Sequence, residues 1–411
     1  MSHELLLKNV GRLVTMQEAK DREGVLGVIC DAALLIKDGK ISWLGKNSEE
    51  VKVGSSAQIL DLRGRVVMPG LVDCHTHLVH SGSRQLEFNM RSKGMSYQQI
   101  ARSGGGIVST VTSTRETSIE DLYSESARRA DEALQHGTTT MEIKTGYGLD
   151  FENEIKIADA IGLLHEKHPM DVMGTFLGAH IVPPEFAHNR SKYIDMLLDE
   201  MMPEMAARKW MTSCDVFIEE IAFNEDEARR ICASAKRFGL AIHLHVDQFS
   251  SARGGEIAAE FGALSADHLD KTSDSGVDAM VKSGVVGVLL PGASFFSGGG
   301  SYPDARRMID RGLVVAIATD YNPGTNPSLD LFLTASIAIT QMKMTCDEAL
   351  LAITKNAARA LGLSDRGVIE KGARGDFIVL DAPDEYYPLY RYGANLVSHV
   401  YIGGREFFHR K

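Results

Sequence analysis

Residues 72–84 read VDCHTHLVHSGSR and place two histidines, one residue apart, at the end of an apolar run. Side chains two positions apart on a β-strand point to the same face, so His75 and His77 should face the same side. Paired imidazoles at a strand end suit a transition metal, although two core histidines held by hydrogen bonds would give the same pattern. The other strand ends of the chain decide between these interpretations.

The middle of the chain alternates short apolar runs with helical patterns such as residues 119–137 and 225–239. A strand followed by a helix, repeated, indicates a parallel sheet, and eight such units match the size of a TIM-like (β/α)8 barrel. A doubly wound open sheet is the alternative, but the GxGxxG expected after its first strand is missing. We therefore predict an α/β fold with a barrel. The apolar runs are residues 70–78, 138–146, 171–180, 214–220, 240–248, 263–269, 285–292 and 314–322.

Both ends of the chain are rich in alternating β-type patterns with Gly-Lys turns. Chain ends often lie close together, so we expect the two segments to join in one small composite β-sandwich beside the barrel. The β-type stretches are residues 5–14, 25–46, 57–68, 375–383 and 395–408. The expected division is residues 1–65 for the N-terminal part of the sandwich, 66–360 for the barrel and 361–411 for the C-terminal part.

The composition limits the kinds of binding partner and the compartment that we expect for the chain. Its 411 residues carry a net charge of −11, which argues against nucleic-acid or anionic-membrane binding but allows a small anionic substrate. No apolar stretch approaches the roughly 18 residues of a membrane span. The five cysteines are scattered without CxxC spacing, which favours a reducing compartment, and we expect a cytoplasmic protein. The cysteines are Cys30, Cys74, Cys214, Cys232 and Cys346.

Polar residues also end the later predicted strands. The fifth strand ends in HLHVDQ, which places His243 and His245 on one face, and the sixth carries Asp267 and His268. The eighth ends in Asp320. The carboxyl ends of barrel strands meet at one mouth, where catalytic residues gather. A buried carboxylate without a partner is costly, and a cation among these side chains would remove that cost.

This set of HxH on the first strand, histidines on the fifth and sixth, and an aspartate on the eighth resembles the amidohydrolase superfamily. The resemblance implies a metal-dependent enzyme in which activated water hydrolyses or deaminates a substrate. Many two-metal members have a bridging lysine on the fourth strand, but here that strand reads CDVFIEEIAF. We therefore expect one divalent ion, zinc or iron, and its ligands would be His75, His77, His245 and Asp320.

Three neighbouring residues leave alternatives open. His243 is the rival to His245 as the ligand from the fifth strand, and otherwise packs behind the metal. Glu219 on the fourth strand is a candidate ligand for a second metal. Lys144 lies on the second strand, two positions from Glu142 on the same face, and we expect an internal ion pair there.

Several stretches are similar to one branch of this superfamily. They are HSGSRQLEF, RSGGGI, EIKTGYGL, GAHIVPPEF, HVDQFS, SADHLD and ATDYNPGT. The resemblance implies hydrolysis of the ring amide of 4-imidazolone-5-propanoate to N-formimidoyl-L-glutamate, a step of histidine degradation, and suggests a homodimer. Asp320 would then act as the base. His268 would orient water or stabilise the oxyanion, unless it is a fifth metal ligand.

The substrate's propanoate tail needs a cation, and the resemblance assigns this role to Arg84. It also assigns substrate contacts to Tyr147 and His180, which alone would be read as packing residues. Gln248 has an amide that suits the amidine edge of the ring. The loop after the eighth strand would grip a carboxylate through Asn322, Gly324 and Thr325. The glycine-rich segments 103–107 and 297–301 indicate loops over the barrel mouth, and the alternative for the first segment is a loop that lies against the substrate.

Two other functions fit parts of the pattern. Another cyclic amidohydrolase or an aromatic deaminase would use the same metal site, but would not need Arg84 for a substrate that lacks a carboxylate. A non-catalytic scaffold would commonly have lost metal ligands, whereas this chain retains the full set.

Overall fold

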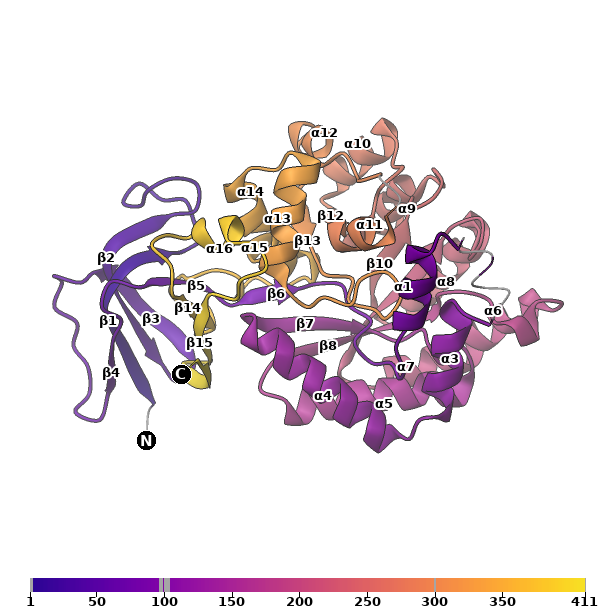
Figure 1. Ribbon diagram of the computed structural model, residues 1–411, viewed down its shortest axis with the longest axis horizontal. Helices are drawn as coiled ribbons and strands as arrows, with labels where there is room; N and C mark the ends of the chain where they lie inside the picture. Colours follow the sequence, from indigo (N-terminus) through magenta and orange to yellow (C-terminus); the bar gives the residue numbers. More distant parts are fainter. Residues whose placement is uncertain (1–2, 96–98, 100–103, 299–300, 411) are drawn as a thin grey trace.

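The computed structural model describes residues 3–95, 99, 104–298 and 301–410. A barrel with helices around it makes up the larger part of the molecule, and a separate sheet lies at one side of it (Figure 1). The predicted (β/α)8 barrel with a small β-structure from both chain ends is thus confirmed. Strand β5 (Val66–Pro69) still pairs in the small sheet, and the first barrel strand, β6, spans Leu71–Asp73.

The barrel strands of the described residues form one parallel sheet in the order β13-β12-β11-β10-β9-β8-β7-β6. The two ends of this order meet just beyond the strands, where Thr76 and Tyr321 form a parallel bridge. Asp320 N donates to the carbonyl of His75 at 3.0 Å, and His77 N donates to the carbonyl of Tyr321 at 2.9 Å. The other strands are β7 (Thr138–Lys144), β8 (Asp171–Ala179), β9 (Met211–Ile218), β10 (Ala241–Val246), β11 (Ser265–His268), β12 (Val286–Leu289) and β13 (Val315–Ile317).

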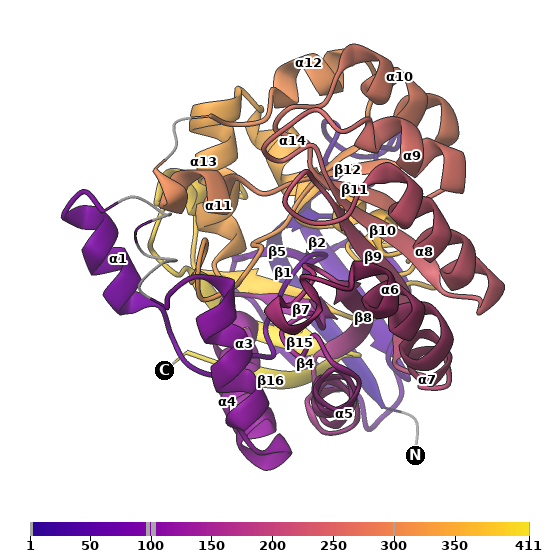
Figure 2. The same ribbon diagram turned by 90° about the vertical axis from the view of Figure 1, so that its right-hand side faces the viewer.

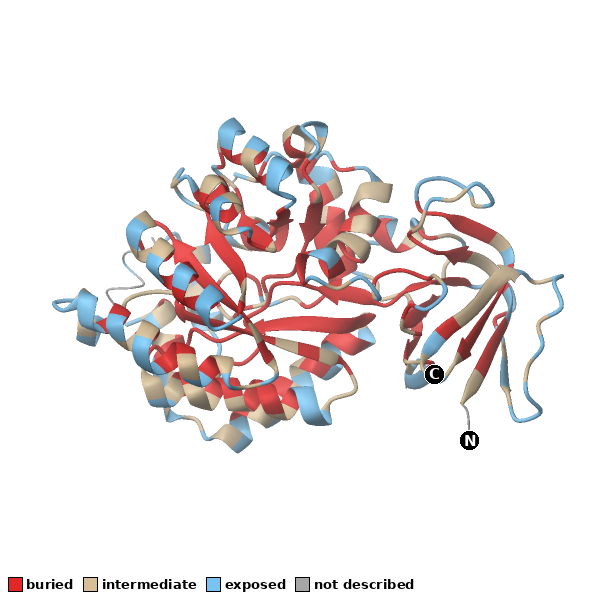
Figure 3. Cartoon of the chain, turned by 180° about the vertical axis from the view of Figure 1, so that it is seen from behind, coloured by how far each residue is buried: buried red, intermediate tan, exposed pale blue. Residues whose placement is uncertain are grey.

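Burial explains why these strands form a barrel. Parallel strands covered by helices are buried on both faces and therefore read as nearly continuous apolar runs. Every residue of β7 is buried, and the barrel strands form the buried centre of Figure 3. Charged residues inside these runs need partners, and Lys144 is paired with Glu142 and Asp215 inside the barrel.

Helices surround the strands, as the end-on view in Figure 2 shows. Their starts follow local sequence signals: Ser118 caps α4, and Asn224 with Glu227 forms a capping box on α8. The longer helices are α3 (Ile107–Glu116), α4 (Ile119–Gln135), α5 (Phe151–Lys167), α8 (Glu225–Arg237), α10 (Asp274–Ser283) and α13 (Leu331–Met342). The shorter ones are α1 (Gln85–Ser92), α6 (Arg190–Met196), α7 (Met202–Ala206), α9 (Gly254–Phe261), α11 (Pro291–Ser297), α12 (Ala305–Asp310), α14 (Cys346–Ala352), α15 (Lys355–Ala360) and α16 (Tyr387–Tyr390).

Both chain ends build the small sheet. Its described strands run in the order β16-β15-β14-β5-β1-β2-β3, and β4 also pairs with β1. The pairs are antiparallel except those of β1 with β4 and β5. The strands are β1 (Glu4–Val14), β2 (Val28–Lys37), β3 (Lys40–Lys46), β4 (Gln58–Asp61), β14 (Phe377–Leu380), β15 (Val397–Ile402) and β16 (Arg405–His409). The pairing of β5 with β14 joins the two chain ends.

Parts of both glycine-rich segments singled out in the sequence, residue 103 and residues 299–300, lie outside the described residues. In the described part of the first segment, Gly106 N donates to Glu87 Oε1 at 3.0 Å. Within the described ranges, no helix has both the length and the apolar character needed to cross a membrane.

Candidate metal centre and active site

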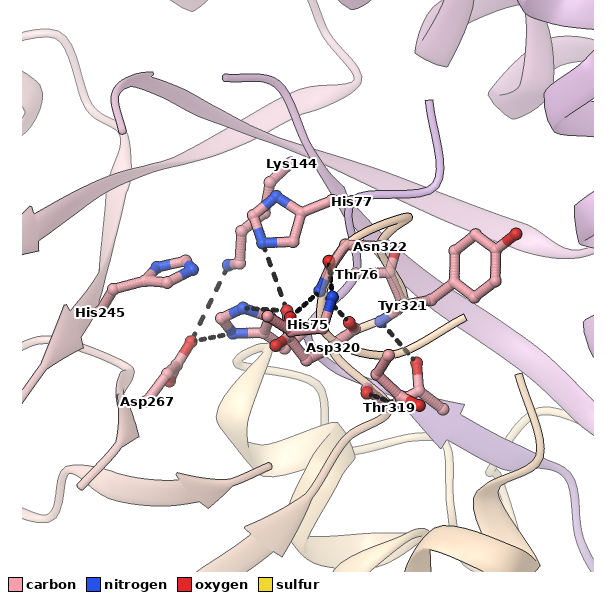
Figure 4. Close-up of polar contacts among 12 residues, drawn as sticks. His75, Thr76, His77, Lys144, His245, Asp267, Thr319, Asp320, Tyr321 and Asn322 are labelled. Atoms are coloured by element: carbon pink, nitrogen blue, oxygen red, sulfur yellow. Dashed lines mark hydrogen bonds and ion pairs between the residues drawn. The ribbon is translucent and has the colours of Figure 1, made fainter. Parts of the chain in front are cut away.

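The four predicted metal ligands lie at the mouth of the barrel in two neighbouring groups that share His75, one with His77 and Asp320 and one with His245 and His268. His75 Nε2 and His77 Nε2 lie 3.6 Å and 3.5 Å from Asp320 Oδ1 (Figure 4). The ring of His245 approaches that of His75 with 4.3 Å between centroids, and that of His77 with 5.5 Å. Ligand atoms of His75, His77 and Asp320 all lie within 4.8 Å of one another, as the distance between donors to one ion requires.

The donor atoms fit a divalent transition metal. Nε2 of His75 and Nε2 of His245 are buried, and neither has a hydrogen-bond partner among the described residues. Burial lowers the pKa of His75, His77 and His245, so these imidazoles are neutral and keep a lone pair for a metal. Three imidazoles and one carboxylate are a donor set that suits zinc or iron.

Asp320 occupies a constrained position at the end of the eighth strand. Its backbone φ is 51°, in the left-handed region that aspartate and asparagine tolerate better than most residues. Asn322 Nδ2 donates to the Asp320 carbonyl at 2.7 Å and so fixes the turn. Burial raises the pKa of the Asp320 carboxyl to about 8. A cation beside this carboxyl would favour its ionised form.

Two aspartates orient the imidazoles, and the sequence analysis did not assign them this role. Asp267 Oδ2 lies 2.6 Å from Nδ1 of His75, and Asp215 Oδ2 lies 2.8 Å from Nδ1 of His245. A carboxylate on Nδ1 fixes the tautomer that leaves Nε2 free for a metal. Asp215 could have been noticed in the sequence as an acid inside the apolar run of the fourth strand.

The predicted ion pair between Lys144 and Glu142 is confirmed, with 2.8 Å between Nζ and Oε1. Glu142 Oε2 also accepts a hydrogen bond from Thr76 N at 3.2 Å, so the pair supports the backbone between the two histidines of the first strand. Lys144 additionally lies 2.8 Å from Asp215 Oδ2, a contact across the barrel that the spacing along one strand did not reveal.

His243 and Glu219, the two alternative metal ligands, make hydrogen bonds of their own away from the candidate ligands. His243 Nδ1 bonds to Ser265 Oγ at 2.8 Å, and Ser265 in turn donates to Asp267 at 2.6 Å, so His243 supports the layer behind the metal position. The carboxylate of Glu219 accepts from Phe249 N at 2.9 Å and from Ser250 N at 3.2 Å. Among the described residues, neither side chain belongs to a group close enough to share an ion.

Further rings line the mouth around the candidate ligands. The ring of His268 lies 5.3 Å from that of His245, and its ligand atom is near those of His75 and His245, as a fifth ligand would require. His180 stacks on His77 at 5.3 Å and is held by a 3.1 Å bond between Nδ1 and the Gly146 carbonyl. The buried Tyr147 ring lies 5.8 Å from His77.

Arg84 lies at the start of α1 and pairs with Glu87 at 3.0 Å. Its guanidinium packs so closely on Gly324 that a β-carbon there would collide with it. This contact joins the loop after the first strand to the loop after the eighth. Glu87 also accepts from Gly106, so the described end of the glycine-rich segment is held beside Arg84.

The loop after Asp320 is folded around the side chain of Asn322. Its Oδ1 accepts from Gly324 N and Thr325 N, both at 2.8 Å, and its Nδ2 donates to Thr325 Oγ1 at 2.7 Å. The backbone amides of Gly324 and Thr325 therefore already donate to a side chain within the loop. Gln248, two residues beyond β10, makes no side-chain hydrogen bond with another described residue.

Comparison with known proteins places the chain in a family. The amidohydrolase family profile matches residues 66–406. Imidazolonepropionase of Geobacillus kaustophilus is 42% identical over 98% of this chain and 97% of its own length. That of Caldanaerobacter subterraneus subsp. tengcongensis is 42% identical over 97% of each chain.

The chain belongs to the imidazolonepropionase branch of the amidohydrolase family. Its match extends over nearly the whole length of these relatives, so the barrel and the small sheet are both part of the shared architecture.

Solved amidohydrolase structures share this fold at lower sequence identity. A 5-methylcytosine deaminase of Klebsiella pneumoniae aligns with a TM-score of 0.75 and 16% identity over 99% of this chain and 98% of its own. An adenosine deaminase of Xanthomonas campestris, solved with bound zinc, aligns with a TM-score of 0.70 and 18% identity over 98% and 92%. These similarities support the fold of the chain. The substrate has to be inferred from the residues of the site.

Proposed function

We propose that the chain hydrolyses the ring amide of 4-imidazolone-5-propanoate to N-formimidoyl-L-glutamate, a step of histidine degradation. The observation that carries the proposal is the convergence of His75, His77, His245 and Asp320 at the barrel mouth. Arg84, packed on the neighbouring Gly324, adds a cation for the substrate's carboxylate tail. The names of the imidazolonepropionase relatives, at about two-fifths identity, agree with this substrate.

The proposed ligands of the divalent ion are His75, His77, His245 and Asp320. When bound, a zinc or ferrous ion supplies Lewis acidity that lowers the pKa of water towards neutrality. Three neutral imidazoles keep the total charge of the ligand set at that of one carboxylate, which leaves the ion a strong Lewis acid.

Asp320 and His268 carry the proton and charge transfers of the proposed reaction. Water adds to the ring carbonyl carbon and gives up a proton to the Asp320 carboxylate. The bond from that carbon to the ring amide nitrogen breaks, and Asp320 returns the proton to the leaving nitrogen. His268, beside His245, orients the water or donates to the developing oxyanion.

The remaining residues bind the substrate in this proposal. Arg84 pairs with the propanoate, and its planar guanidinium can hold both carboxylate oxygens. Tyr147 and His180 form the wall beside His77. Gln248 offers an amide donor and acceptor to the amidine edge of the ring. Asn322 acts through the loop that it folds, because Gly324 is the surface on which Arg84 rests.

The proposal extends to the native metal, the oligomeric state and the compartment. The metal is zinc or iron, on the chemistry of the donor set. A homodimer is proposed from the resemblance, and the exposed Tyr390 and Tyr392 provide aromatic surface of a kind enriched at interfaces. A cytoplasmic location is proposed because all five cysteines are free.

The direct test is a substrate assay with metal analysis on the purified protein. We expect loss of the ultraviolet absorbance of 4-imidazolone-5-propanoate, formation of N-formimidoyl-L-glutamate, and a single zinc or iron ion per chain. Removal of the metal by a chelator should abolish turnover, and zinc or ferrous ion should restore it. If the metal-loaded protein leaves this substrate intact but releases ammonia from cytosine or guanine, the chain is a deaminase instead.

Gly324→Ala tests the position of Arg84 without removing its charge. The new methyl group would meet the guanidinium, which is the mobile end of a long side chain, so Arg84 should move while the backbone keeps its fold. We expect a higher KM with an almost unchanged melting temperature and metal content. Gly54→Ala is the matched control, because a β-carbon there would make only ordinary contacts with the side chain of Glu4. An unchanged KM in Gly324→Ala would contradict the assigned place of the substrate tail.

A further inference from the structure

Lys144 is a fully buried lysine whose position the reaction proposed above does not use. Its side chain is 0% exposed, at the end of β7 inside the barrel. The ammonium lies 2.8 Å from Glu142 Oε1, 2.8 Å from Asp215 Oδ2 and 3.9 Å from Asp267 Oδ2. Burying a charge is costly unless the charge is paired, so the ammonium of Lys144 and the carboxylates around it stabilise one another.

The oxygens that face Lys144 also hold two of the candidate metal ligands. Asp215 Oδ2 bonds to His245 Nδ1 at 2.8 Å, and Asp215 Oδ1 accepts from His245 N at 3.1 Å. Asp267 Oδ2 bonds to His75 Nδ1 at 2.6 Å (Figure 4). One ammonium thus lies between the carboxylates that orient imidazoles from the first and the fifth barrel strands.

The electrostatics of this layer depend on the same ammonium. The carboxylates of Asp215 and Asp267 both lie beside Lys144. Two buried carboxylates repel each other unless a positive charge lies between them. A neutral side chain at position 144 would leave that repulsion uncompensated. The carboxylates would then move apart, and the imidazole rings bonded to them would turn with them.

We propose that Lys144 is a positioning residue of the metal centre, whose ammonium fixes Asp215 and Asp267 and thereby aims Nε2 of His245 and His75 at a shared divalent cation. This inference rests on the metal site of the proposed function, but not on the identity of the substrate. In this proposal Lys144 is neither a ligand of the ion nor a substrate-binding residue. Its effect should therefore be seen first in metal binding.

Lys144→Met tests this because methionine has similar length and no charge. Zinc affinity is measured by competition with a chromophoric chelator, and the visible spectrum of the cobalt-substituted protein reports the coordination geometry. Partners that orient metal ligands typically contribute about 10–100-fold to metal affinity, and we expect a loss of this size. The cobalt bands should shift as well. With saturating metal, kcat should fall more than KM rises.

Lys156→Met is the matched control. Lys156 on α5 donates to the Arg115 carbonyl at 2.7 Å and is partly exposed, so its replacement removes the same charge from a site away from the ligands. It should retain wild-type zinc affinity and cobalt spectrum. A folded Lys144→Met protein with both wild-type properties would overturn the proposal.

Two further sets of variants keep the inference testable if Lys144→Met does not fold. Lys144→Gln retains amide donors for the carboxylates and should bind zinc more weakly than wild type. If that variant also fails to fold, Asp215→Asn and Asp267→Asn decide, because each cuts one link between Lys144 and an imidazole. Wild-type zinc affinity in Lys144→Gln, or in both aspartate variants, would overturn the inference. The wild-type substrate assay is independent of all these results, so the two proposals fail separately.

Discussion

The Asp320→Asn variant is expected to lose about 10²–10⁴-fold in kcat while it keeps its fold, because proton transfer by a positioned group contributes that much. Asparagine has the same shape and tolerates the φ of 51° found at this position. The backbone bond from residue 320 to the His75 carbonyl does not involve the side chain. The change removes a negative ligand and the proton acceptor together, so metal affinity should fall as well.

The measurements for this variant are kcat with saturating metal, metal content and melting temperature. Asp195→Asn is a suitable control, because that exposed carboxylate pairs only with Arg230 in α8 among its described ion pairs, at 3.2 Å. It should behave as wild type in all three measurements. An Asp320→Asn enzyme that is fully loaded with metal and turns over at the wild-type rate would rule out the assigned role of this carboxylate.

Arg84→Ala is expected to weaken substrate binding by roughly 2–5 kcal/mol, the cost of removing one partner from a buried charge pair. This corresponds to an increase of about 30- to 5,000-fold in KM, since each 1.4 kcal/mol is tenfold. The Arg84 side chain is 14% exposed, so its charge is only partly screened by water. Turnover at saturating substrate should fall much less, because the proposed partner of Arg84 is the propanoate tail and not the reacting carbonyl.

A matched experiment separates binding of the tail from a general effect of the mutation. Arg84→Lys keeps the charge but loses the two-pronged geometry, and its KM should lie between those of wild type and Arg84→Ala. The exposed Arg128 of α4 provides the control Arg128→Ala, which should leave KM unchanged. A carboxylate-free substrate analogue should bind wild type and Arg84→Ala equally. Equal KM values for the true substrate would exclude Arg84 as the anchor of the tail.

The closeness of the candidate ligands at one mouth could be predicted because it depends on regularities within single strands. Alternation places His75 and His77 on one face, and the carboxyl ends of barrel strands share one mouth. The same alternation predicted the pair of Lys144 with Glu142, which the structure contains. These inferences need no knowledge of which strands are neighbours.

The orienting carboxylates could not be predicted because they depend on register and on contacts across the barrel. His245 stands opposite Asp267 on one side and Phe217 on the other, yet its ring bonds to Asp215, two residues before Phe217. Asp267 instead reaches His75, from a strand that is not its neighbour in the sheet. Spacing along one strand carries no information about either contact.

The loop after the eighth strand shows a second reason why the sequence does not predict every feature of the site. The resemblance assigned this loop to a carboxylate, and it did not reveal that Asn322 accepts from the backbone amides of Gly324 and Thr325. Glu219, considered as a metal ligand, accepts from the backbone at Phe249 and Ser250. In both cases a polar side chain is used to fold a local turn, an outcome that competes with ligand binding for the same residue types.

The bridge between Thr76 and Tyr321 closes the barrel between the first and the last of its strands. Candidate metal ligands lie on both sides of this seam, at positions 75 and 320 of the chain. An ion bound by both residues would link the first and the last barrel strand directly. These two strands are otherwise far apart along the chain. The proposed ion would therefore add a connection across this seam to the backbone contacts already there, and its removal should lower the melting temperature of the protein.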